Sequence, residues 1–248
     1  MAGADLAGAN ISRCDFTKTN LTGAYLSRAN LARSDLTRAE LPKSNLSGAD
    51  LSWADLSWAN LSDANMGDAN LYGATLYEAN LLGANLSNAN LGGVADLVRA
   101  NLTGANLRRA DLSNVHLLEA ILAWANLSEA VLSSGSDLLM AANLGGADLS
   151  HANLAGADLG RATLLGANLS DSNLTGTNLT EAKLSMANLT RANLSGSNLS
   201  GADLSHANLA GADLTGANLH DADLSNTNLT GANLTNVVGA NLTRAIME

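Results

Sequence analysis

The sequence is poor in aromatic residues, proline and cysteine. Aromatic residues make up 3% of its 248 residues, and it has one proline, one phenylalanine and one cysteine. The single cysteine, Cys14, excludes a disulfide framework, and the shortage of large side chains excludes a core of packed Phe, Ile and Val. Because 46% of the residues are nevertheless hydrophobic, the composition also argues against disorder. A folded core must therefore consist mainly of leucine and alanine.

Long hydrophobic runs are lacking as well. The chain has no apolar run of about 18 residues, the length that a membrane span needs. Its first residues, MAGADLAGANIS, form neither the basic nor the apolar region of a signal peptide. Asn-Leu-Ser and Asn-Leu-Thr recur, as at Asn20 and Asn45, and a eukaryotic secretory route would invite glycosylation at these sites. We therefore expect a cytoplasmic, bacterial setting and no membrane partner.

A hydrophobic residue recurs at every fifth position, and it is almost always leucine. The step holds from Leu6 to Leu91, over residues 97–132 and over residues 144–234. If this residue is called i, then i−2 is mostly Ala, i−1 mostly Asn or Asp, i+1 mostly Ser or Thr, and i+2 varies. The frame slips by one residue after Leu91, takes two six-residue steps through Leu138 to Leu144, and takes a longer step from Leu234 to Leu242. We interpret the slips as bulges or slightly wide corners, not as projecting loops.

A period of five fits a chain that turns after every short extended segment. On a helix, five-residue steps would smear the leucines around the axis and leave no apolar stripe. On an extended segment, i−2 and i point to one side and i−1 to the other. Gly is frequent at i+2, where a type II turn needs a positive φ, and Pro42 stands at i+1, which Pro favours. Repeats with Arg, Trp or Asp at i+2 are expected to use another turn type.

The unit Ala-(Asn/Asp)-Leu-(Ser/Thr)-x resembles the repeat of the pentapeptide-repeat protein family, across essentially the whole chain. The resemblance implies an all-β solenoid, a right-handed quadrilateral β-helix with four pentapeptide repeats per coil and hence about 12 coils. We expect one domain over 1–248, regular over 4–91 and 144–234, irregular over 92–143 with one-residue frame slips, and ragged over 235–248. Stacked Asn at i−1 should form hydrogen-bonded ladders.

Charge is unevenly distributed along the chain. The net charge is −10, yet residues 1–45 contain six Lys or Arg and four Asp or Glu, whereas residues 46–98 contain six acids and no base. The six basic residues of this tip all occupy i+2, which places them on the outer corners: Arg13, Lys18, Arg28, Arg33, Arg38 and Lys43.

Residues that could support catalysis are scattered. A filled rod has flat walls, whereas catalysis needs groups that converge in a pocket. His116, His151, His206 and His220 lie on distant repeats without metal-ligand spacing, and we interpret them as solvated turn residues. Cys14 occupies an i−2 position and is expected to fill the core. The sequence therefore predicts a protein that is not an enzyme and has no catalytic, cofactor-binding or metal site.

One group of outward-facing residues is a candidate partner-binding site. With four repeats per coil, residues 20 apart are stacked, so Trp53 should lie near Tyr72 and Trp58 near Tyr77, at one corner. Exposed aromatic clusters often mark binding surfaces. The alternative is that these rings only cover the neighbouring backbone. The candidate partner-binding residues are Trp53, Trp58, Tyr72, Tyr77, Arg33 and Arg38.

Three functions remain open from the sequence. The first is a rigid scaffold that binds a protein partner through an outer face. The second follows from the family resemblance: some members mimic DNA, bind DNA gyrase or topoisomerase IV, and protect the enzyme. This chain carries less charge than a duplex of equal length, which has one charge per ~1.7 Å, and no direct nucleic-acid binding is expected. The third is a structural rod that self-associates end to end or as a dimer.

Overall fold

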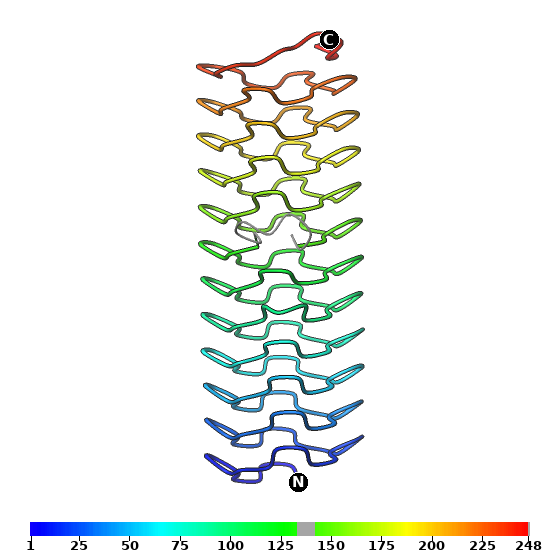
Figure 1. Ribbon diagram of the computed structural model, residues 1–248, viewed down its shortest axis with the longest axis vertical. Helices are drawn as coiled ribbons and strands as arrows, with labels where there is room; N and C mark the ends of the chain where they lie inside the picture. The colour runs from blue at the N-terminus through cyan, green and yellow to red at the C-terminus, as the bar shows by residue number, and fades with distance from the viewer. Residues whose placement is uncertain (133–141, 248) are drawn as a thin grey trace.

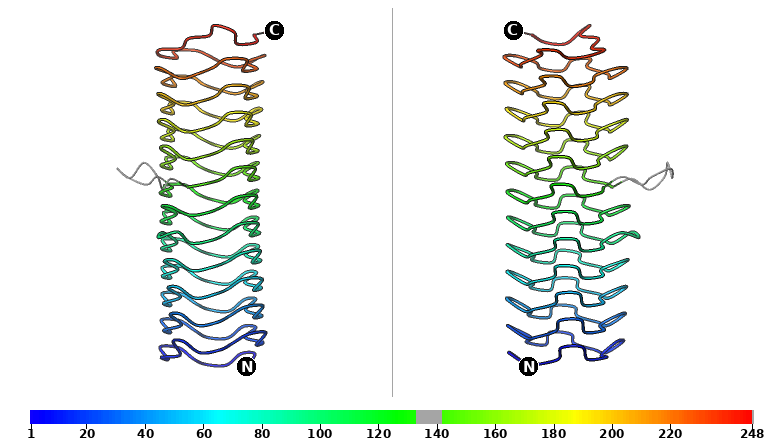
Figure 2. Two further views of the ribbon diagram at one scale, coloured as in Figure 1. Left: turned by 45° about the vertical axis from the view of Figure 1, so that its right-hand side comes forward. Right: turned by 90° about the vertical axis from the view of Figure 1, so that its left-hand side faces the viewer.

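The protein is an elongated rod of stacked coils, with its two termini at opposite ends (Figures 1 and 2). The computed structural model describes residues 1–132 and 142–247. Within the regular stretches, residues separated by 20 positions pair in parallel, as Asn45 does with Asn65 and Asn65 with Asn85. Twenty residues correspond to four repeats of five, so each coil has four faces. The described part of the chain is therefore a four-sided β-helix.

Each repeat contributes a single bridging residue, at i−1, and not a longer strand. The Asn65 N–H donates to the Ser44 carbonyl of the preceding coil at 2.9 Å, and the Met66 N–H donates to the Asn85 carbonyl of the next coil at 2.7 Å. These bonds satisfy the extended backbone in both directions along the rod. Within 1–132 and 142–247 there is no helix that is long and apolar enough to cross a membrane.

The turns between faces share one conformation, whatever residue occupies i+2. In a representative turn, the Ala64 N–H donates to the Leu61 carbonyl at 3.0 Å, and Asp63 at i+2 has a φ of 55°. Arg13, Trp53 and Gly73 have φ values of 58°, 59° and 66° at the same position. The prediction of a second turn type for Arg, Trp or Asp is therefore wrong. Stacking of the coils on both sides imposes the positive φ on residues that rarely adopt it alone.

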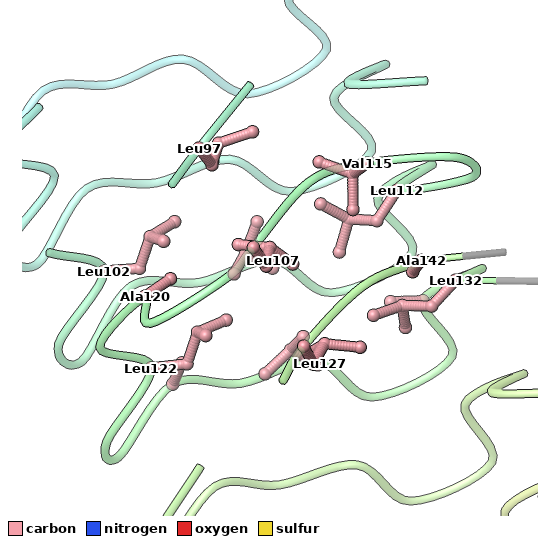
Figure 3. Packing of buried hydrophobic residues seen from close by; sticks show 14 of the residues in the cluster. Leu97, Leu102, Leu107, Leu112, Val115, Ala120, Leu122, Leu127, Leu132 and Ala142 are labelled. Carbon is pink, nitrogen blue, oxygen red and sulfur yellow. The ribbon is translucent and has the colours of Figure 1, made fainter. Parts of the chain in front are cut away.

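The core is a column of leucine and alanine layers. The central leucines from Leu21 to Leu219 that the structure describes are about 0% exposed, and the alanines two residues before them are 0–1% exposed along most of the rod. Figure 3 shows Leu97, Leu102, Leu107 and Leu112 pointing inward from successive repeats. Each such leucine contributes roughly 1.5–3 kcal/mol of transfer free energy. The predicted Leu/Ala core is confirmed.

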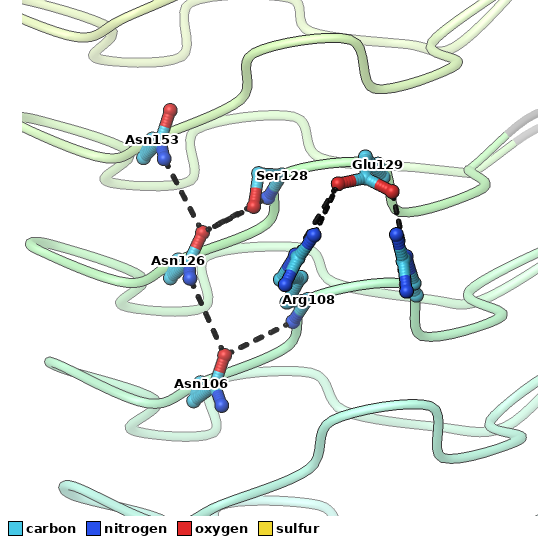
Figure 4. Close-up of polar contacts among 7 residues, drawn as sticks. Asn106, Arg108, Asn126, Ser128, Glu129 and Asn153 are labelled. Atoms are coloured by element: carbon cyan, nitrogen blue, oxygen red, sulfur yellow. Dashed lines mark hydrogen bonds and ion pairs between the residues drawn. The ribbon is translucent and has the colours of Figure 1, made fainter.

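The outward asparagines form ladders along the rod, as predicted. Asn173 donates through Nδ2 to Asn153 Oδ1 at 3.0 Å, one coil away. Asn126 Oδ1 accepts from Asn153 Nδ2 at 3.4 Å and from its own turn, where Ser128 Oγ donates at 2.8 Å (Figure 4). A second set of bonds runs from the i+1 backbone N–H to the i−1 side-chain oxygen, so the same residue type stabilises both the stack and the turn.

The first frame slip is a corner widened by one residue, one of the two predicted alternatives. Asn101 stacks on Asn80 with a separation of 21 residues instead of 20. The extra residue extends the turn, because both Gly93 and Val94 have positive φ values, of 70° and 64°.

The second irregularity differs from the prediction. The predicted repeat centred on Leu138 lies outside the described residues. The flanking repeats are consecutive, since His116 pairs with Asn143 and Val131 with Asp158. The Ala142 N–H also donates to the Leu132 carbonyl at 3.3 Å, as across an ordinary turn. The repeat centred on Leu144 therefore follows the repeat centred on Leu132 directly. The six-residue spacing in the sequence does not reveal that these two repeats are consecutive.

The two end coils also depart from the prediction. Val238 pairs with Asn218 in the i−1 position, five residues after Asn233, so Gly239 takes the place of the central leucine and no long step to Leu242 occurs. A Cβ at Gly239 would lie 2.7 Å from the His220 Cα, which only glycine avoids. Cys14 is exposed and does not fill the core. It belongs to the first coil, and no other coil of the described chain stacks on the outer side of that coil.

Candidate functional site

The four faces of the rod differ in their outward i−1 columns. We number them in chain order from the first coil, so that face 1 begins at Asp5, face 2 at Asn10, face 3 at Asp15 and face 4 at Asn20. Faces 1, 2 and 4 carry asparagine in most coils. Among the described residues of face 3 that pair with a neighbouring coil, only Asn143 is an asparagine, so the face lacks a ladder. Its column is Asp15, Asp35, Asp55, Thr75, Asp96, His116, Asn143, Thr163, Lys183, Asp203 and Asp223.

On both edges of face 3, the i+2 residues of the first three coils follow the same order: a cation, a second cation and then a tryptophan. The corner between faces 2 and 3 carries Arg13, Arg33 and then Trp53, and the corner between faces 3 and 4 carries Lys18, Arg38 and then Trp58. Each row across the face therefore has an aspartate between two cations, or between two tryptophans. Trp53, Trp58 and four of the six basic residues of the predicted tip thus border a single face, whereas Arg28 and Lys43 lie on the other two corners.

The first aromatic pair lies on the corner between faces 2 and 3. Trp53 and Tyr72 pack edge to face, with ring centroids 5.7 Å apart and an interplanar angle of 75°. A Cβ at Gly73 would lie 2.7 Å from the Trp53 ring, and one at Gly93 would lie 2.2 Å from the Tyr72 ring. Each ring therefore lies over a glycine of the next coil, which leaves room for it.

The second aromatic pair lies on the other edge of face 3. Trp58 and Tyr77 also pack edge to face, with centroids 5.6 Å apart. The Arg38 guanidinium carbon is 5.2 Å from the Trp58 ring centroid, a cation–π contact. Trp58 Nε1 donates to Glu78 Oε2 at 3.0 Å. Contacts from the preceding and the following coils thus fix the Trp58 ring.

The expected pairings are confirmed, but their place is different from the prediction. The pairs occupy the two corners that border face 3 and not a single corner. Together they form an exposed aromatic patch, in which Trp53 is 51%, Trp58 45% and Tyr72 43% exposed, while Tyr77 is half-buried. Arg33 is exposed one coil before Trp53 and, within the described residues, makes no cation–π contact or ion pair.

The aspartates of face 3 act as acceptors for their own turns. The Thr37 N–H donates to Asp35 Oδ1 at 2.9 Å, and the Thr17 N–H donates to Asp15 Oδ1 at 2.8 Å. Hydrogen bonds from the hydroxyl and then the N–H of Thr37 hold the pKa of the Asp35 carboxyl below its ordinary value, and Thr17 acts likewise on Asp15. At Asp223, the N–H and then the hydroxyl of Ser225 lower the carboxyl pKa. These three carboxylates are therefore anionic near neutral pH.

These carboxylates should make the rod less stable in acid. A folded-state pKa below the unfolded value gives stability that is present above the unfolded value, near 3.8, and is lost as the pH falls through the folded one. We expect the urea midpoint to decrease between pH 5 and about pH 2. The combined Asp15→Asn, Asp35→Asn and Asp223→Asn variant keeps the acceptor oxygens, and its urea midpoint should decrease less over the same pH range. An equal decrease in both proteins would contradict this assignment.

One aromatic contact was missed by the sequence reasoning. Trp124, which is 65% exposed, stacks on His151 with ring centroids 4.1 Å apart and an interplanar angle of 9°. A stacking rule of 20 residues does not connect the two, because residues that pair between these two coils are 27 positions apart, as Asn126 and Asn153 are. His116, expected in a turn, lies instead on face 3.

The remaining histidines and acids do not converge. In the part of the chain that the structure describes, no three His, Cys, Asp or Glu side chains are placed to hold a metal ion. A shallow depression of about 290 Å³ near the C-terminal end is lined by Thr180, Glu181, Ser200, Gly201, His220 and Asp221. His220 Nε2 lies 3.4 Å from Asp221 Oδ2, on exposed side chains. This geometry offers a salt contact and no enclosed reaction site.

The repeat pattern matches a known family model, described as pentapeptide repeats. The matched segments cover most of the chain: residues 1–23, 19–57, 54–93, 95–133, 142–180, 157–196 and 197–236. The chain belongs to the pentapeptide-repeat family. A comparison with curated protein sequences found no significant match.

Several solved pentapeptide-repeat structures are similar to this chain. HetL, involved in heterocyst differentiation regulation in the cyanobacterium Nostoc, is 36% identical, with 96% of this chain and 91% of HetL covered and a TM-score of 0.41. A protein of the Arabidopsis thaliana thylakoid lumen is 30% identical over 51% of this chain and 69% of its own, with a TM-score of 0.35. Trypsin-treated QnrB1, a plasmid-mediated fluoroquinolone resistance protein, is 19% identical over 98% and 93%, with a TM-score of 0.35.

Proposed function

We propose that this protein is a non-catalytic interaction scaffold of the bacterial cytoplasm, a single right-handed rod over 1–248 with about 12 coils, that binds a protein partner through face 3. The observation that carries the proposal is the aromatic patch. Trp53, Trp58 and Tyr72 are each more than two-fifths exposed, yet ring, glycine and hydrogen-bond contacts hold them in place. Rigid, exposed aromatic side chains bind a partner with little loss of conformational entropy.

Replacing the tryptophans tests this proposal. We expect Trp53→Ala or Trp58→Ala to weaken capture of the partner from a lysate of the source organism by roughly 30-fold, the effect of losing a central aromatic anchor. Trp124→Ala is the matched control, because Trp124 is also an exposed tryptophan but lies away from face 3. It should leave capture of the same protein unchanged.

Circular dichroism separates binding from folding in these variants. The spectra of Trp53→Ala and Trp58→Ala should equal that of the unchanged protein, because neither ring lies in the Leu/Ala core. Loss of the fold would assign the rings to covering the turns. Equal loss of capture in all three variants would exclude face 3 as the binding surface.

A second candidate is a DNA-mimicking binder of gyrase or topoisomerase IV. The column of carboxylates on face 3 and the net charge of −10 favour it, whereas the cations on both edges of that face oppose it. A supercoiling assay with gyrase, with and without a fluoroquinolone, distinguishes the two. Inhibition or protection at low micromolar protein would favour mimicry, and no effect at tens of micromolar would favour a different partner.

A further inference from the structure

Along most of the rod, arginines on the corners lie against acids of the neighbouring coil. Arg99 Nε is 2.8 Å from Glu119 Oε2, Arg161 Nε is 2.9 Å from Glu181 Oε2, and Arg191 Nη2 is 2.6 Å from Asp171 Oδ2. Arg108 and Arg109 share Glu129 in the same way (Figure 4). Between residues 99 and 191, corner arginines thus pair with an acid of an adjacent coil.

In the first two coils, by contrast, the basic residues on the edges of face 3 have basic neighbours and not acidic ones. On one edge Arg13 precedes Arg33, and on the other Lys18 precedes Arg38, each in hydrogen-bonded neighbouring coils. Coils are separated by ~4.8 Å, so like charges are stacked on both edges. Within the described residues, none of these four cations makes an ion pair. Stacked like charges destabilise a sheet, and replacing one member by an acid would relieve the repulsion.

We infer that the first three coils of face 3 bind an acidic protein segment. Its carboxylates pair with the Arg13/Arg33 and Lys18/Arg38 stacks, and an apolar side chain of the same segment rests on Trp53 and Trp58 in the next row. This inference rests on the proposed function and specifies the partner of the same surface. Charge complementarity decides the occupant, because two columns of unpaired cations lead directly to the aromatic patch.

The aspartates between the two cation columns favour a protein over a nucleic acid. Asp15, Asp35 and Asp55 run down the middle of the face, one per coil. A phosphate backbone carries charge continuously, one per ~1.7 Å of duplex, and would meet this column. A protein segment can place carboxylates at the edges and backbone N–H groups or neutral side chains over the centre. The pattern of cation, acid, cation across the face thus matches a partner that has negative charges at its two edges and none between them.

Charge reversal gives a test in which binding and stability change in opposite directions. Arg33→Glu and Lys18→Glu each convert a stack of cations into an ion pair like that of Arg99 and Glu119. Glutamate is accommodated at this turn position, since Glu119 itself has a φ of 57°. Arg161→Glu is the matched control, because it makes the same charge change but places two acids together, against Glu181.

The probe is a short fluorescein-labelled peptide of alternating glutamate and leucine, with binding followed by anisotropy at low and at physiological salt. We expect Arg33→Glu and Lys18→Glu to weaken binding by about tenfold or more, the effect of reversing a contacting charge, and to raise the thermal midpoint. Arg161→Glu should leave binding unchanged and lower the midpoint. Binding should weaken as salt increases.

Several outcomes would overturn the inference. These are the absence of peptide binding to the unchanged protein, binding that Arg33→Glu does not alter, tighter binding of a single-stranded oligonucleotide than of the peptide, or light scattering that shows a second copy of the rod on this face. If Trp58→Ala abolishes capture of a partner while Arg33→Glu does not, the scaffold function stands and only the acidic partner is wrong. If neither variant affects capture, the proposed scaffold function of face 3 is contradicted as well.

Discussion

Leu81→Ala should lower the free energy of unfolding by about 2–5 kcal/mol, the range for a leucine truncated in a packed core. The same replacement at Leu82 should change it by no more than about 0.5 kcal/mol, as at ordinary surface positions. Leu81 is 0% exposed in the central column, whereas its neighbour Leu82 is 45% exposed at i+1. The layers above and below Leu81 are held by backbone bonds to adjacent coils, so they cannot collapse fully into the space left by its side chain.

Urea unfolding followed by circular dichroism measures both leucine variants. Because solenoid repeats unfold through neighbour interactions, hydrogen exchange of the amides around residue 81 should report the same loss locally. Equal destabilisation by the two replacements would contradict the assignment of i as the only large inward position of the repeat. A small effect at Leu81 would mean that the core relaxes around the missing side chain.

Asp63→Pro should destabilise the rod by about 3 kcal/mol or more, while Ser62→Pro should cost about 1 kcal/mol or less. Asp63 has a φ of 55°, which proline, fixed near −65°, does not adopt. Its N–H also donates to the Leu82 carbonyl at 2.8 Å. Ser62 stands at the first central turn position, which proline favours, and its N–H donates only to Asn60 Oδ1, at 3.2 Å.

The natural proline supports this difference between adjacent positions. Pro42 occupies the same i+1 position one coil earlier, and there Glu40 takes the place of the ladder asparagine. Since proline has no N–H for the i−1 side chain, Glu40 instead accepts Asn60 Nδ2 at 2.8 Å. Thermal midpoints of the two proline variants provide the measurement. A Ser62→Pro variant as unstable as Asp63→Pro would mean that the i+1 N–H is essential.

Much of the fold followed from the spacing of residues alone. The five-residue period required leucine and alanine to face inward and asparagine outward, and the ladders and the core have that arrangement. The pairs Trp53–Tyr72 and Trp58–Tyr77 followed from a 20-residue coil. The relation held for these pairs because no insertion separates their members.

The sequence was misleading where one conformation serves many residue types. Gly at i+2 indicated a positive φ, and Arg or Trp at i+2 indicated a different turn, because isolated residues obey that preference. Stacked coils override it, as Trp53 shows. The leucine at position 138 continued an approximate period, but the pairing of His116 with Asn143 shows that the neighbouring repeats meet without it.

The sequence by itself determined that this chain is a repeat protein with a leucine core, because a strict period leaves one way to bury the same side chain in every unit. Only the tertiary structure decided which outward residues share a face. The position of a residue around the coil depends on the sum of all steps before it, so a bulge or an insertion changes every later alignment. Face 3 could therefore be followed beyond residue 91, and its lack of an asparagine ladder recognised along the rod, only when the coils were stacked.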